Sequence, residues 1–364
     1  MRTVVTGGAG FIGGPVVREL TTAGHDVLVL DSLRTDAHHD GGAGTRARLN
    51  GTGVGLAVGD VRDLDFVTGH LDGADAVVHL AAKVGLGARF DDIDDYVSSN
   101  ALGTAVLLRA CAATGVRRFV QASSMVVYGD GQYSCEAHGL VRAGPRTPAA
   151  LAAGQFEPPC PHCGAALTPI EVDENVAADP RNTYAATKVM QEQLATVWAR
   201  ETNSSVVSLR LHNVYGPGLP RDTPYAGVAA IFASAIDRGE SPRVFEDGGQ
   251  RRDFVHVDDV AGAFVAALTA TTRSGLRPPA AVEGSHAAYN VGSGVVTTAL
   301  GMAAALAAAA GGPPPVLTGE YRLGDVRHIV ASSVRISNAL GWSARVPLEG
   351  GVRDLSGLAV PPEQ

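Results

Sequence analysis

The sequence has little lysine, few aromatic residues and no long apolar run. Of its 29 basic residues only Lys83 and Lys188 are lysines, and aromatic residues make up 5% of the 364 positions. A membrane-spanning helix needs roughly 20 predominantly apolar residues, and no uninterrupted stretch approaches that length, so we expect no membrane segment. The net charge is −8 and no basic run occurs, which argues against nucleic-acid binding through a basic face.

A secretory signal is also missing. Only Arg2 precedes the apolar run that begins at Thr3, so there is neither a basic region nor a cleavage site, and we expect a cytoplasmic protein. The four cysteines would then be in a reducing compartment, where closely spaced thiols favour metal binding over disulfides. The 45% hydrophobic content is enough for the core of one large domain or two closely packed ones.

Residues 1–130 alternate short apolar runs with helical stretches, which is the pattern of parallel βαβ units. The pattern predicts an α/β fold with a doubly wound parallel sheet. Strands are expected at Thr3–Thr6, Val27–Leu30, Gly55–Val58, Ala76–Leu80 and Phe119–Ala122, with helices at Phe11–Ala23, Val61–Leu71 and Asn100–Thr114. Further along, the pattern predicts a helix at Thr183–Glu201, a strand at Val206–Leu211, a return to the sheet at Ala288–Val291 and an Ala-rich helix over 299–310.

A glycine motif near the start predicts a dinucleotide site. Gly7, Gly10 and Gly13 stand three apart between a predicted strand and a predicted helix, where the backbone must turn tightly and approach a pyrophosphate. Asp31 ends the second strand, where a carboxylate binds the adenosine ribose and repels a 2′-phosphate. The motif therefore predicts NAD, with NADP left as an alternative because of the nearby Arg34. Asp60, after the third strand, either meets the adenine amino group or caps the following helix.

Tyr184 and Lys188 stand four apart on a predicted helix and so share one face. A phenol with a pKa of about 10 is a poor base at neutral pH, and lowering that pKa by about 3 units requires roughly 4 kcal/mol of preferential stabilisation of the phenolate. A neighbouring ammonium together with a positive nicotinamide can supply it. Ser124 follows a strand that ends at the ligand-binding edge of such a sheet, where its hydroxyl can bind the substrate oxygen or cap the strand end.

With these motifs the chain resembles the NAD-dependent nucleotide-sugar epimerase/dehydratase family, a group of extended short-chain dehydrogenases/reductases. Its details are most similar to the dTDP-L-rhamnose 4-epimerase-like and UDP-glucose 4-epimerase-like members. The resemblance is carried by Thr6–Gly13, Asp31, Gly59–Asp63, His79–Ala82, Ser123–Gly129, Tyr184–Lys188, Leu209–Pro217 and Arg251–Val260.

The resemblance implies a Rossmann domain over residues 1–214, interrupted by an insertion at 131–175, and a smaller C-terminal α/β lobe over 215–364 that binds a nucleotide sugar. It implies a homodimer as well. The positions expected at the cofactor are Gly7, Gly10, Phe11, Ile12, Gly13, Asp31, Asp60, Val61, Leu80, Ala81, Ala82, Tyr184 and Lys188. Those expected at the substrate are Ser124, Asn213, Arg252, Arg322 and Asp325, of which the two arginines would bind phosphate.

The two residues that follow Ser124 limit the reactions that the family resemblance allows. Dehydratases of the family have an Asp-Glu pair there, whereas this chain has Met125-Val126, which can transfer no proton. We therefore expect NAD-dependent epimerisation at C4 of a dTDP- or UDP-hexose through a transient 4-keto sugar. The alternative is an NAD(P)H-dependent reductase of nucleotide 4-keto sugars, against which Asp31 argues.

The insertion carries two short motifs of one kind. Cys135-x-x-His138 and Cys160-x-x-Cys163 are each followed by glycine, and together they offer the three thiolates and one imidazole of a tetrahedral structural zinc site. Metal binding would also order a segment that is rich in Pro and Gly. We expect a zinc-ribbon-like hairpin that covers the sugar pocket or contributes to a dimer, and a disulfide or inert thiols are the alternatives. Cys111, among Ala and Leu, is expected in the core.

Overall fold

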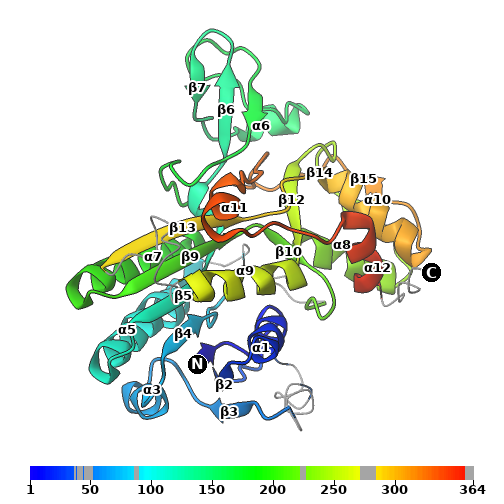
Figure 1. The fold of residues 1–364 in the computed structure, drawn as a ribbon. Coiled ribbons are helices and arrows are strands. Elements are labelled where there is room, and N and C mark those ends of the chain that lie inside the picture. Colours follow the sequence, from blue (N-terminus) through cyan, green and yellow to red (C-terminus); the bar gives the residue numbers. More distant parts are fainter. Residues whose placement is uncertain are drawn as a thin grey trace.

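The computed structural model describes residues 1–36, 38, 44, 52–85, 90–221, 227–270 and 284–356. A seven-stranded parallel sheet runs through its larger part in the order β13-β9-β5-β4-β1-β2-β3 (Figure 1). The strands are β1 (Arg2–Thr6), β2 (Asp26–Asp31), β3 (Gly55–Val58), β4 (Ala76–His79), β5 (Arg118–Ser124), β9 (Ser205–Leu211) and β13 (Ser285–Val291). The doubly wound sheet is confirmed, and the chain returns to it at β13 as the apolar run at 288–291 predicts.

Helices cover both faces of this sheet. One face packs against α1 (Gly13–Thr22), α9 (Val257–Ala270) and α11 (Val334–Leu340), and the other against α3 (Leu64–Leu71), α5 (Gly103–Thr114) and α7 (Thr183–Thr202). Side chains alternate between the two cores along a strand, so Val5 faces α1 while its neighbour Val4 faces α3 and α5. Both valines are fully buried, which explains the continuous apolar strands.

Two helices begin later than the sequence predicts. The helix expected from Phe11 begins at Gly13, because residues 7–12 form the tight turn that precedes it. The helix expected from Val61 begins at Leu64, because the side chain of Asp63 accepts a hydrogen bond from the Phe66 N–H and caps the helix there. Three short helical segments, η1 (Phe90–Asp92), α4 (Ile93–Tyr96) and the π-helix η2 (Val97–Leu102), lead into α5.

A smaller lobe lies beside the carboxyl edge of the sheet, at the right in Figure 1. It contains the three-stranded sheet β10-β12-β14 and the pair β11-β15, and α8, α10 and α12 close a separate apolar core. The bounds are β10 (Asn213–Tyr215), α8 (Val228–Asp237), β11 (Arg243–Val244), β12 (Arg251–His256), β14 (Val296–Thr298), α10 (Ala299–Ala310), β15 (Val316–Leu317) and α12 (Leu348–Leu355).

The insertion projects away from both parts, at the top of Figure 1. After η3 (Met125–Tyr128) it forms the antiparallel sheet β7-β6-β8 from β6 (Gln132–Cys135), β7 (Gly139–Val141) and β8 (Thr168–Ile170), with α6 (Pro148–Ala152) beside it. Its two ends meet at a neck, where the Asp179 N–H donates to the Val127 oxygen at 2.8 Å. The hairpin has a small core of its own that includes Tyr133 and Leu167.

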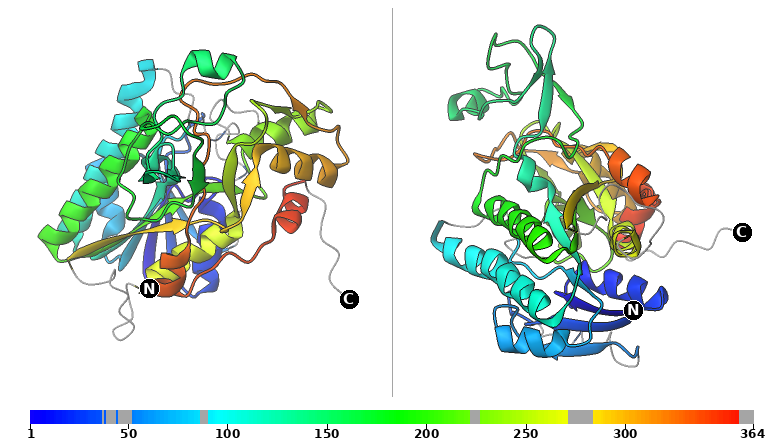
Figure 2. Two further views of the ribbon diagram at one scale, coloured as in Figure 1. Left: turned by 90° about the horizontal axis from the view of Figure 1, so that it is seen from above. Right: turned by 60° about the vertical axis from the view of Figure 1, so that its left-hand side comes forward.

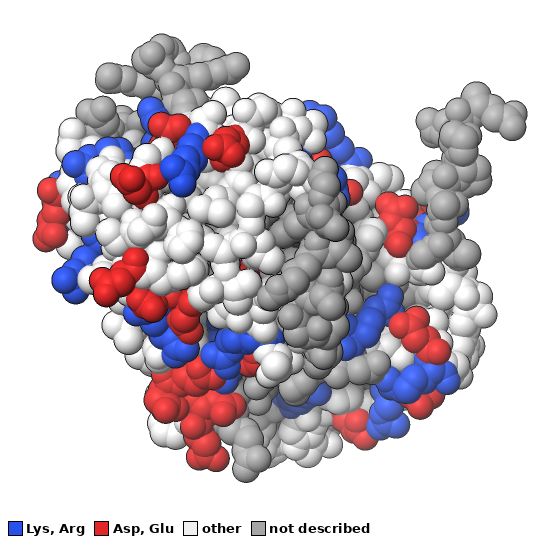
Figure 3. Space-filling model, turned by 90° about the horizontal axis from the view of Figure 1, so that it is seen from below, with Lys and Arg blue, Asp and Glu red and all other residues white. Residues whose placement is uncertain are grey.

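Charge is mixed on one face of the molecule (Figure 3). On the face drawn in Figure 3, acidic and basic side chains lie in mixed groups around broad uncharged areas. Among the helices of the described residues, none is long and apolar enough to cross a membrane.

Candidate active site

The glycine turn between β1 and α1 has the shape of a phosphate cradle. A Cβ on Gly7, which has φ +72°, would lie 2.5 Å from the Ala81 nitrogen, and one on Gly13 would lie 2.3 Å from the Gly7 oxygen. These two glycines are therefore required by close backbone packing. Gly10 differs, because among the described residues its Cβ would meet only the Gly7 oxygen within 4 Å, at 3.4 Å. The room beside Gly10 at the start of a helix fits the approach of a pyrophosphate.

Asp31 joins the end of β2 to this turn. One of its carboxylate oxygens accepts the Ala9 N–H at 3.0 Å and the other accepts the Leu33 N–H at 2.9 Å. A carboxylate has about four acceptor positions, so Asp31 can also accept hydrogen bonds from ribose hydroxyls. Its geometry fits the predicted contact with NAD.

Asp60 is bound by its own neighbour. Its carboxylate accepts hydrogen bonds from the Arg62 backbone and side chain at 2.6 to 2.9 Å, and this lowers the pKa of Asp60. The helix cap that the sequence left as an alternative for Asp60 belongs to Asp63.

The turn after β4, which contains Leu80, Ala81 and Ala82, is held by a residue that the sequence analysis did not select. Asn100 accepts the Lys83 N–H at 2.7 Å and donates to the Thr187 hydroxyl at 3.0 Å. Thr187 lies on α7 between Tyr184 and Lys188. Asn100 therefore connects the turn after β4 to α7, but nothing in its local sequence distinguishes it from other helical asparagines.

Tyr184 and Lys188 lie one turn apart near the start of α7, as predicted. The Asn182 side chain caps that helix by accepting the Ala185 N–H at 2.8 Å. The Lys188 ammonium lies 5.8 Å from the centre of the Tyr184 ring and donates to the Ala122 oxygen of β5 at 2.9 Å. The helix and the strand thus fix the ammonium beside the phenol.

The pKa values of Tyr184 and Lys188 are both shifted by burial. Burial raises the pKa of Tyr184 to about 12, although a hydrogen bond with Ser124 acts in the opposite direction. Burial also lowers the pKa of Lys188 to about 8, which Glu192 opposes. Both shifts have one cause, because burial disfavours the charged form of each group. The chain's own groups alone therefore do not lower the pKa of the phenol, and the sequence analysis expects a positive nicotinamide to act together with the ammonium.

Ser124 is the last residue of β5, and its hydroxyl interacts with two neighbouring groups. Its hydroxyl accepts the Val126 N–H at a long 3.4 Å and so caps η3, which is the capping role left open by the sequence. The Ser124 hydroxyl also acts to lower the pKa of Tyr184, so the two side chains lie close together. The structure thus brings Ser124, Tyr184 and Lys188 together.

Asn213 begins β10, where the chain leaves the large sheet for the smaller lobe. Its side-chain oxygen is buried and has no hydrogen-bond partner among the described residues. The preceding His212 is buried too, and both of its ring nitrogens lack partners among those residues. Buried polar atoms are nearly always satisfied, so these atoms keep hydrogen-bonding capacity that the described residues do not use.

Arg252, which the sequence analysis expects at the diphosphate, supports neighbouring backbone. Its guanidinium donates to the backbone oxygens of Arg251, Val326 and Arg327 at 2.6 to 3.0 Å. Burial lowers its pKa to about 10, an effect that the acids Asp325 and Glu246 oppose. Within the described part of the chain, three of its five N–H donors are used in this way and two are not.

Arg322 and Asp325 lie on an exposed segment just before the Val326 and Arg327 carbonyls. The Arg322 guanidinium stacks over the Phe245 ring at 5.2 Å, and the Asp325 backbone oxygen accepts a hydrogen bond from Arg146 of the insertion at 2.7 Å. The two residues predicted to bind the nucleotide are therefore on one segment that Arg252 supports.

The cysteine motifs meet at the tip of the insertion. Cys135, His138, Cys160 and Cys163 offer ligand atoms that all lie within 4.8 Å of one another. The distances are 3.5 Å from Cys135 Sγ to His138 Nδ1, 3.7 Å from Cys160 Sγ to His138 Nδ1 and 3.8 Å from Cys135 Sγ to Cys163 Sγ. Bonds of about 2.0–2.3 Å to a tetrahedral zinc place its ligands about 3.5–3.8 Å apart, so the set fits zinc. All four cysteines of the chain are free thiols, and Cys111 is fully buried in the core.

A doubly wound sheet with a glycine turn, an acid at the end of β2 and a Tyr-Lys pair on α7 defines a dinucleotide-binding protein of the short-chain dehydrogenase/reductase type. The model of the NAD dependent epimerase/dehydratase family matches residues 3–152 and 162–292, and the chain belongs to that family.

The chain is similar to several characterised members. The dTDP-L-rhamnose 4-epimerase of Burkholderia thailandensis is 33% identical over 358 residues, which cover 97% of this chain and 93% of the relative. The UDP-glucose 4-epimerase of Thermotoga maritima, solved with UDP-glucose, superposes with a TM-score of 0.77 at 27% identity over 98% of both chains. The UDP-glucose 4-epimerase of Thermus thermophilus, solved with NAD, gives 0.73 at 29% identity, also over 98% of both.

Proposed function

We propose that the protein is an NAD-dependent 4-epimerase of a nucleoside diphosphate hexose, with dTDP or UDP as the nucleotide. The single observation that carries the proposal is the cluster of Ser124, Tyr184 and Lys188 at the edge of the sheet where β5 ends. The similarity to 4-epimerases for dTDP-L-rhamnose and UDP-glucose supports it.

The cofactor site would use the glycine turn and the two elements beside it. Gly10 leaves room for the pyrophosphate, Asp31 would accept the ribose hydroxyls and Lys188 would donate to the nicotinamide ribose. When bound there, NAD supplies hydride acceptance, hydride return and a positive charge. That charge adds to the ammonium and offsets the burial that raises the pKa of Tyr184.

The phenol of Tyr184 would transfer the proton in the reaction. Tyr184 would remove the proton of the C4 hydroxyl while Ser124 binds the same oxygen, and Tyr184 would return the proton to the inverted alcohol. Lys188 holds its charge next to the phenolate throughout, because the Ala122 oxygen fixes its position. The 4-keto sugar must turn over between the two transfers, so the sugar has to be bound loosely.

The nucleotide would be bound firmly at the other end. Asn213 and the two remaining donors of Arg252 would face the diphosphate, while Arg322 would bind phosphate and Asp325 a ribose hydroxyl. A diphosphate held in this way anchors the substrate while the sugar rotates.

Two other reactions are less well supported. Dehydration needs a proton donor after Ser124, and Met125-Val126 offers none. The alternative reductase would exchange NADPH at each turnover, which the carboxylate of Asp31 disfavours, and the relatives named above are 4-epimerases.

The insertion would hold structural zinc through Cys135, His138, Cys160 and Cys163. The separations between these atoms support this assignment. Four protein ligands leave no open position, so zinc would stabilise the hairpin and take no part in the reaction. Reduced thiols also suit the cytoplasmic location expected from the sequence.

A homodimer would form through α5 and α7, which lie side by side (Figure 2). Leu102 is 51% exposed just before α5 and Val197 is 50% exposed on α7, with Met190 and Val97 also exposed. Apolar side chains gathered on two neighbouring helices are typical of a protein interface.

Incubation with a panel of dTDP- and UDP-hexoses without added cofactor tests the function. Bound NAD should suffice, and proton NMR of C4 should show a mixture of both epimers. Conversion that requires stoichiometric NADPH would instead establish the reductase.

A further inference from the structure

The segment 321–327, which carries Arg322 and Asp325, is held from two sides. On one side the Arg252 guanidinium donates to the backbone oxygens of Val326 at 2.6 Å and Arg327 at 3.0 Å. Since Arg252 lies on β12, this contact comes from within the smaller lobe. The second contact comes from the insertion.

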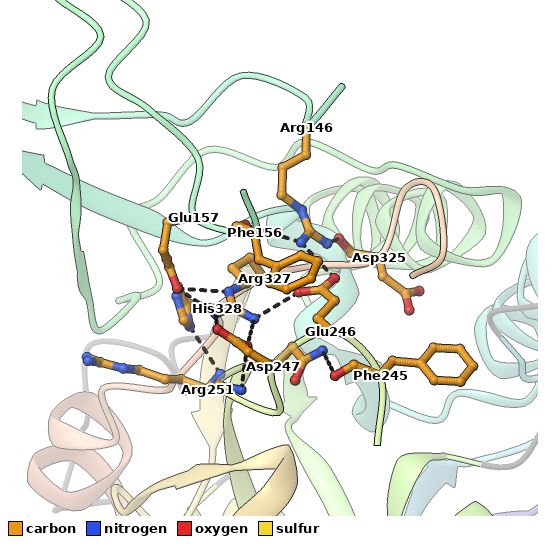
Figure 4. A network of polar contacts seen from close by, with 12 residues as sticks. Arg146, Phe156, Glu157, Phe245, Glu246, Asp247, Arg251, Asp325, Arg327 and His328 are labelled. Carbon is orange, nitrogen blue, oxygen red and sulfur yellow. Dashed lines mark hydrogen bonds and ion pairs between the residues drawn. The ribbon is translucent and has the colours of Figure 1, made fainter. Parts of the chain in front are cut away.

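Arg146 of the insertion reaches across to the lobe (Figure 4). Its Nη2 donates to the backbone oxygen of Asp325 at 2.7 Å, and its Nη1 donates to Glu246 at 2.7 Å and to the Phe156 oxygen at 3.3 Å. The Arg146 side chain is 9% exposed and that of Glu246 is 2% exposed, so the ion pair between them is largely shielded from water, whereas the bond to Asp325 lies at the surface.

Glu246 stands between two arginines. One carboxylate oxygen binds Arg146 and the other binds Arg327 at 2.8 Å, and its side chain is 2% exposed. Its φ of +54° is unusual for a residue other than glycine and is kept only where its surroundings enforce it. The two guanidinium groups thus fix this loop between β11 and β12.

A second part of the insertion touches the same segment. Glu157 binds the Arg327 guanidinium at 2.6 and 2.9 Å and the His328 ring at 2.8 Å. At the neck, a Cβ on Gly131 would lie 2.5 Å from the His328 oxygen, so the two backbones are in close contact. The insertion is therefore joined to the lobe at several places, and Figure 4 shows that these charged groups form one network.

We propose that Arg146 is a positioning residue for nucleotide-sugar recognition, through which the inserted hairpin fixes segment 321–327 and completes the subsite for the nucleoside diphosphate. The inference rests on the proposed function. Arg146 acts through the Asp325 backbone and Glu246, not on the reacting atoms. Its effect is therefore on affinity for the nucleotide, while the rate of the chemical step is set at Tyr184.

The test compares Arg146→Ala and Arg146→Lys with the unmodified, NAD-loaded protein. It measures KM and kcat for the nucleotide sugar, the dissociation constants of TDP and UDP by calorimetry, and the NAD content. Arg142→Ala is the matched control, because Arg142 is also an arginine of the insertion. Among the described residues it binds the Ala177 oxygen at 2.7 Å and the Asp179 carboxylate at 3.5 Å, near the neck, and no residue of the lobe.

Arg146→Ala should raise KM and the nucleoside diphosphate dissociation constant by about tenfold, with kcat within about threefold and NAD content unchanged. The KM and dissociation constants of Arg146→Lys should lie between those of the unmodified protein and Arg146→Ala. An ammonium can bind Glu246 but lacks the planar fork that also reaches Asp325. Arg142→Ala should stay within about twofold of the unmodified protein. The lysine variant keeps the charge beside Glu246 and therefore remains informative if the alanine variant folds poorly.

Unchanged nucleotide affinity in both Arg146 variants would overturn the inference alone. A loss of kcat with unchanged KM would overturn it as well. If the unmodified protein binds neither TDP nor UDP, the proposed function fails and the inference fails with it. The two failures are thus distinguishable from the same set of measurements.

Discussion

The guanidinium of Arg34 binds both carboxylate oxygens of Asp95, at 3.1 and 2.9 Å. Asp36 binds the same guanidinium, and the Lys83 ammonium reaches Asp95 at 2.6 Å. The pKa of Asp95 is accordingly lowered, first by Arg34 and also by Lys83. Arg34 is the residue that kept NADP open in the sequence, and in the structure two carboxylates neutralise its charge.

This pairing predicts the cofactor preference of an altered protein. Asp95→Asn should free part of the charge of Arg34 and Lys83 for a 2′-phosphate and reduce the preference for NAD over NADP by about tenfold. Calorimetry with nucleotide-free protein measures both affinities. Asp94→Asn is the control, because it removes the same charge from an exposed neighbour. An equal change in both variants would contradict the specific role of Asp95.

The Tyr184 and Lys188 pair makes a prediction about pH. Tyr184→Phe should lower kcat by about 10²–10⁴-fold with bound NAD retained. Lys188→Met removes a positive charge that favours the phenolate, so the acidic limb of the kcat profile should move to higher pH. Lys83→Met, at the only other lysine, should leave that limb in place. A profile that Lys188→Met does not shift would exclude electrostatic support of the phenolate.

The glycine turn, the strands of residues 1–130 and the Tyr184 and Lys188 pair could be predicted because short spacings determine them. A residue pair four apart on a helix shares a face whatever surrounds it. The same holds for the turn at Gly7 and Gly13, whose backbones approach one another too closely for any side chain. Local pattern was sufficient for these features.

The remaining contacts depend on tertiary structure. Arg146 and Glu246 are 100 residues apart, and Arg34 and Asp95 are 61 apart. Neither pair has a local signal, since a single arginine or acid in a loop is usually exposed to solvent. For the same reason the sequence placed Arg252 at the phosphate but could not predict that it binds the Val326 and Arg327 carbonyls.

The proposed zinc site predicts metal content and local stability. The purified protein should contain about one zinc per chain, and Cys160→Ser or Cys163→Ser should lose it. Without the metal the hairpin should become sensitive to protease while the large sheet stays protected, because the hairpin's own core is small. Cys111→Ser, at a buried thiol in the large core, is the control and should keep its zinc. Full zinc content in the Cys160 and Cys163 variants would refute the site.

The exposed apolar residues of η2, just before α5, and of α7 predict the oligomer. Leu102→Asp should convert the dimer into monomers, because an unpaired carboxylate cannot be buried in an apolar interface without a large cost. Light scattering after size-exclusion chromatography gives the mass of the particle. Leu140→Asp is the matched control, since Leu140 is 66% exposed on β7 of the insertion. If Leu140→Asp dissociates the particle instead, the interface is formed by the hairpin.

His79 predicts how stability depends on pH. It is buried between the Thr6 hydroxyl at 2.7 Å and the Thr104 hydroxyl at 2.9 Å. Burial, and secondarily the charge of Lys188, lowers its pKa to about 3. The unfolded chain therefore binds a proton below pH 6.5 that the folded chain does not. The stability due to neutral His79 is complete above pH 6.5 and is lost as the pH falls towards 3, with a slope of up to about 1.4 kcal/mol per pH unit.

His79→Gln keeps a neutral polar side chain and should remove that slope. Between pH 7 and pH 5 the free energy of unfolding of this variant should fall by about 2 kcal/mol less than that of the unmodified protein. Urea denaturation at the two pH values measures the difference. His70→Gln changes a histidine on the last turn of α3 and should keep the original pH dependence. If His79→Gln also keeps the original pH dependence, His79 must be protonated in the folded chain well above pH 3. The two short contacts with threonine hydroxyls in a buried core argue against such protonation.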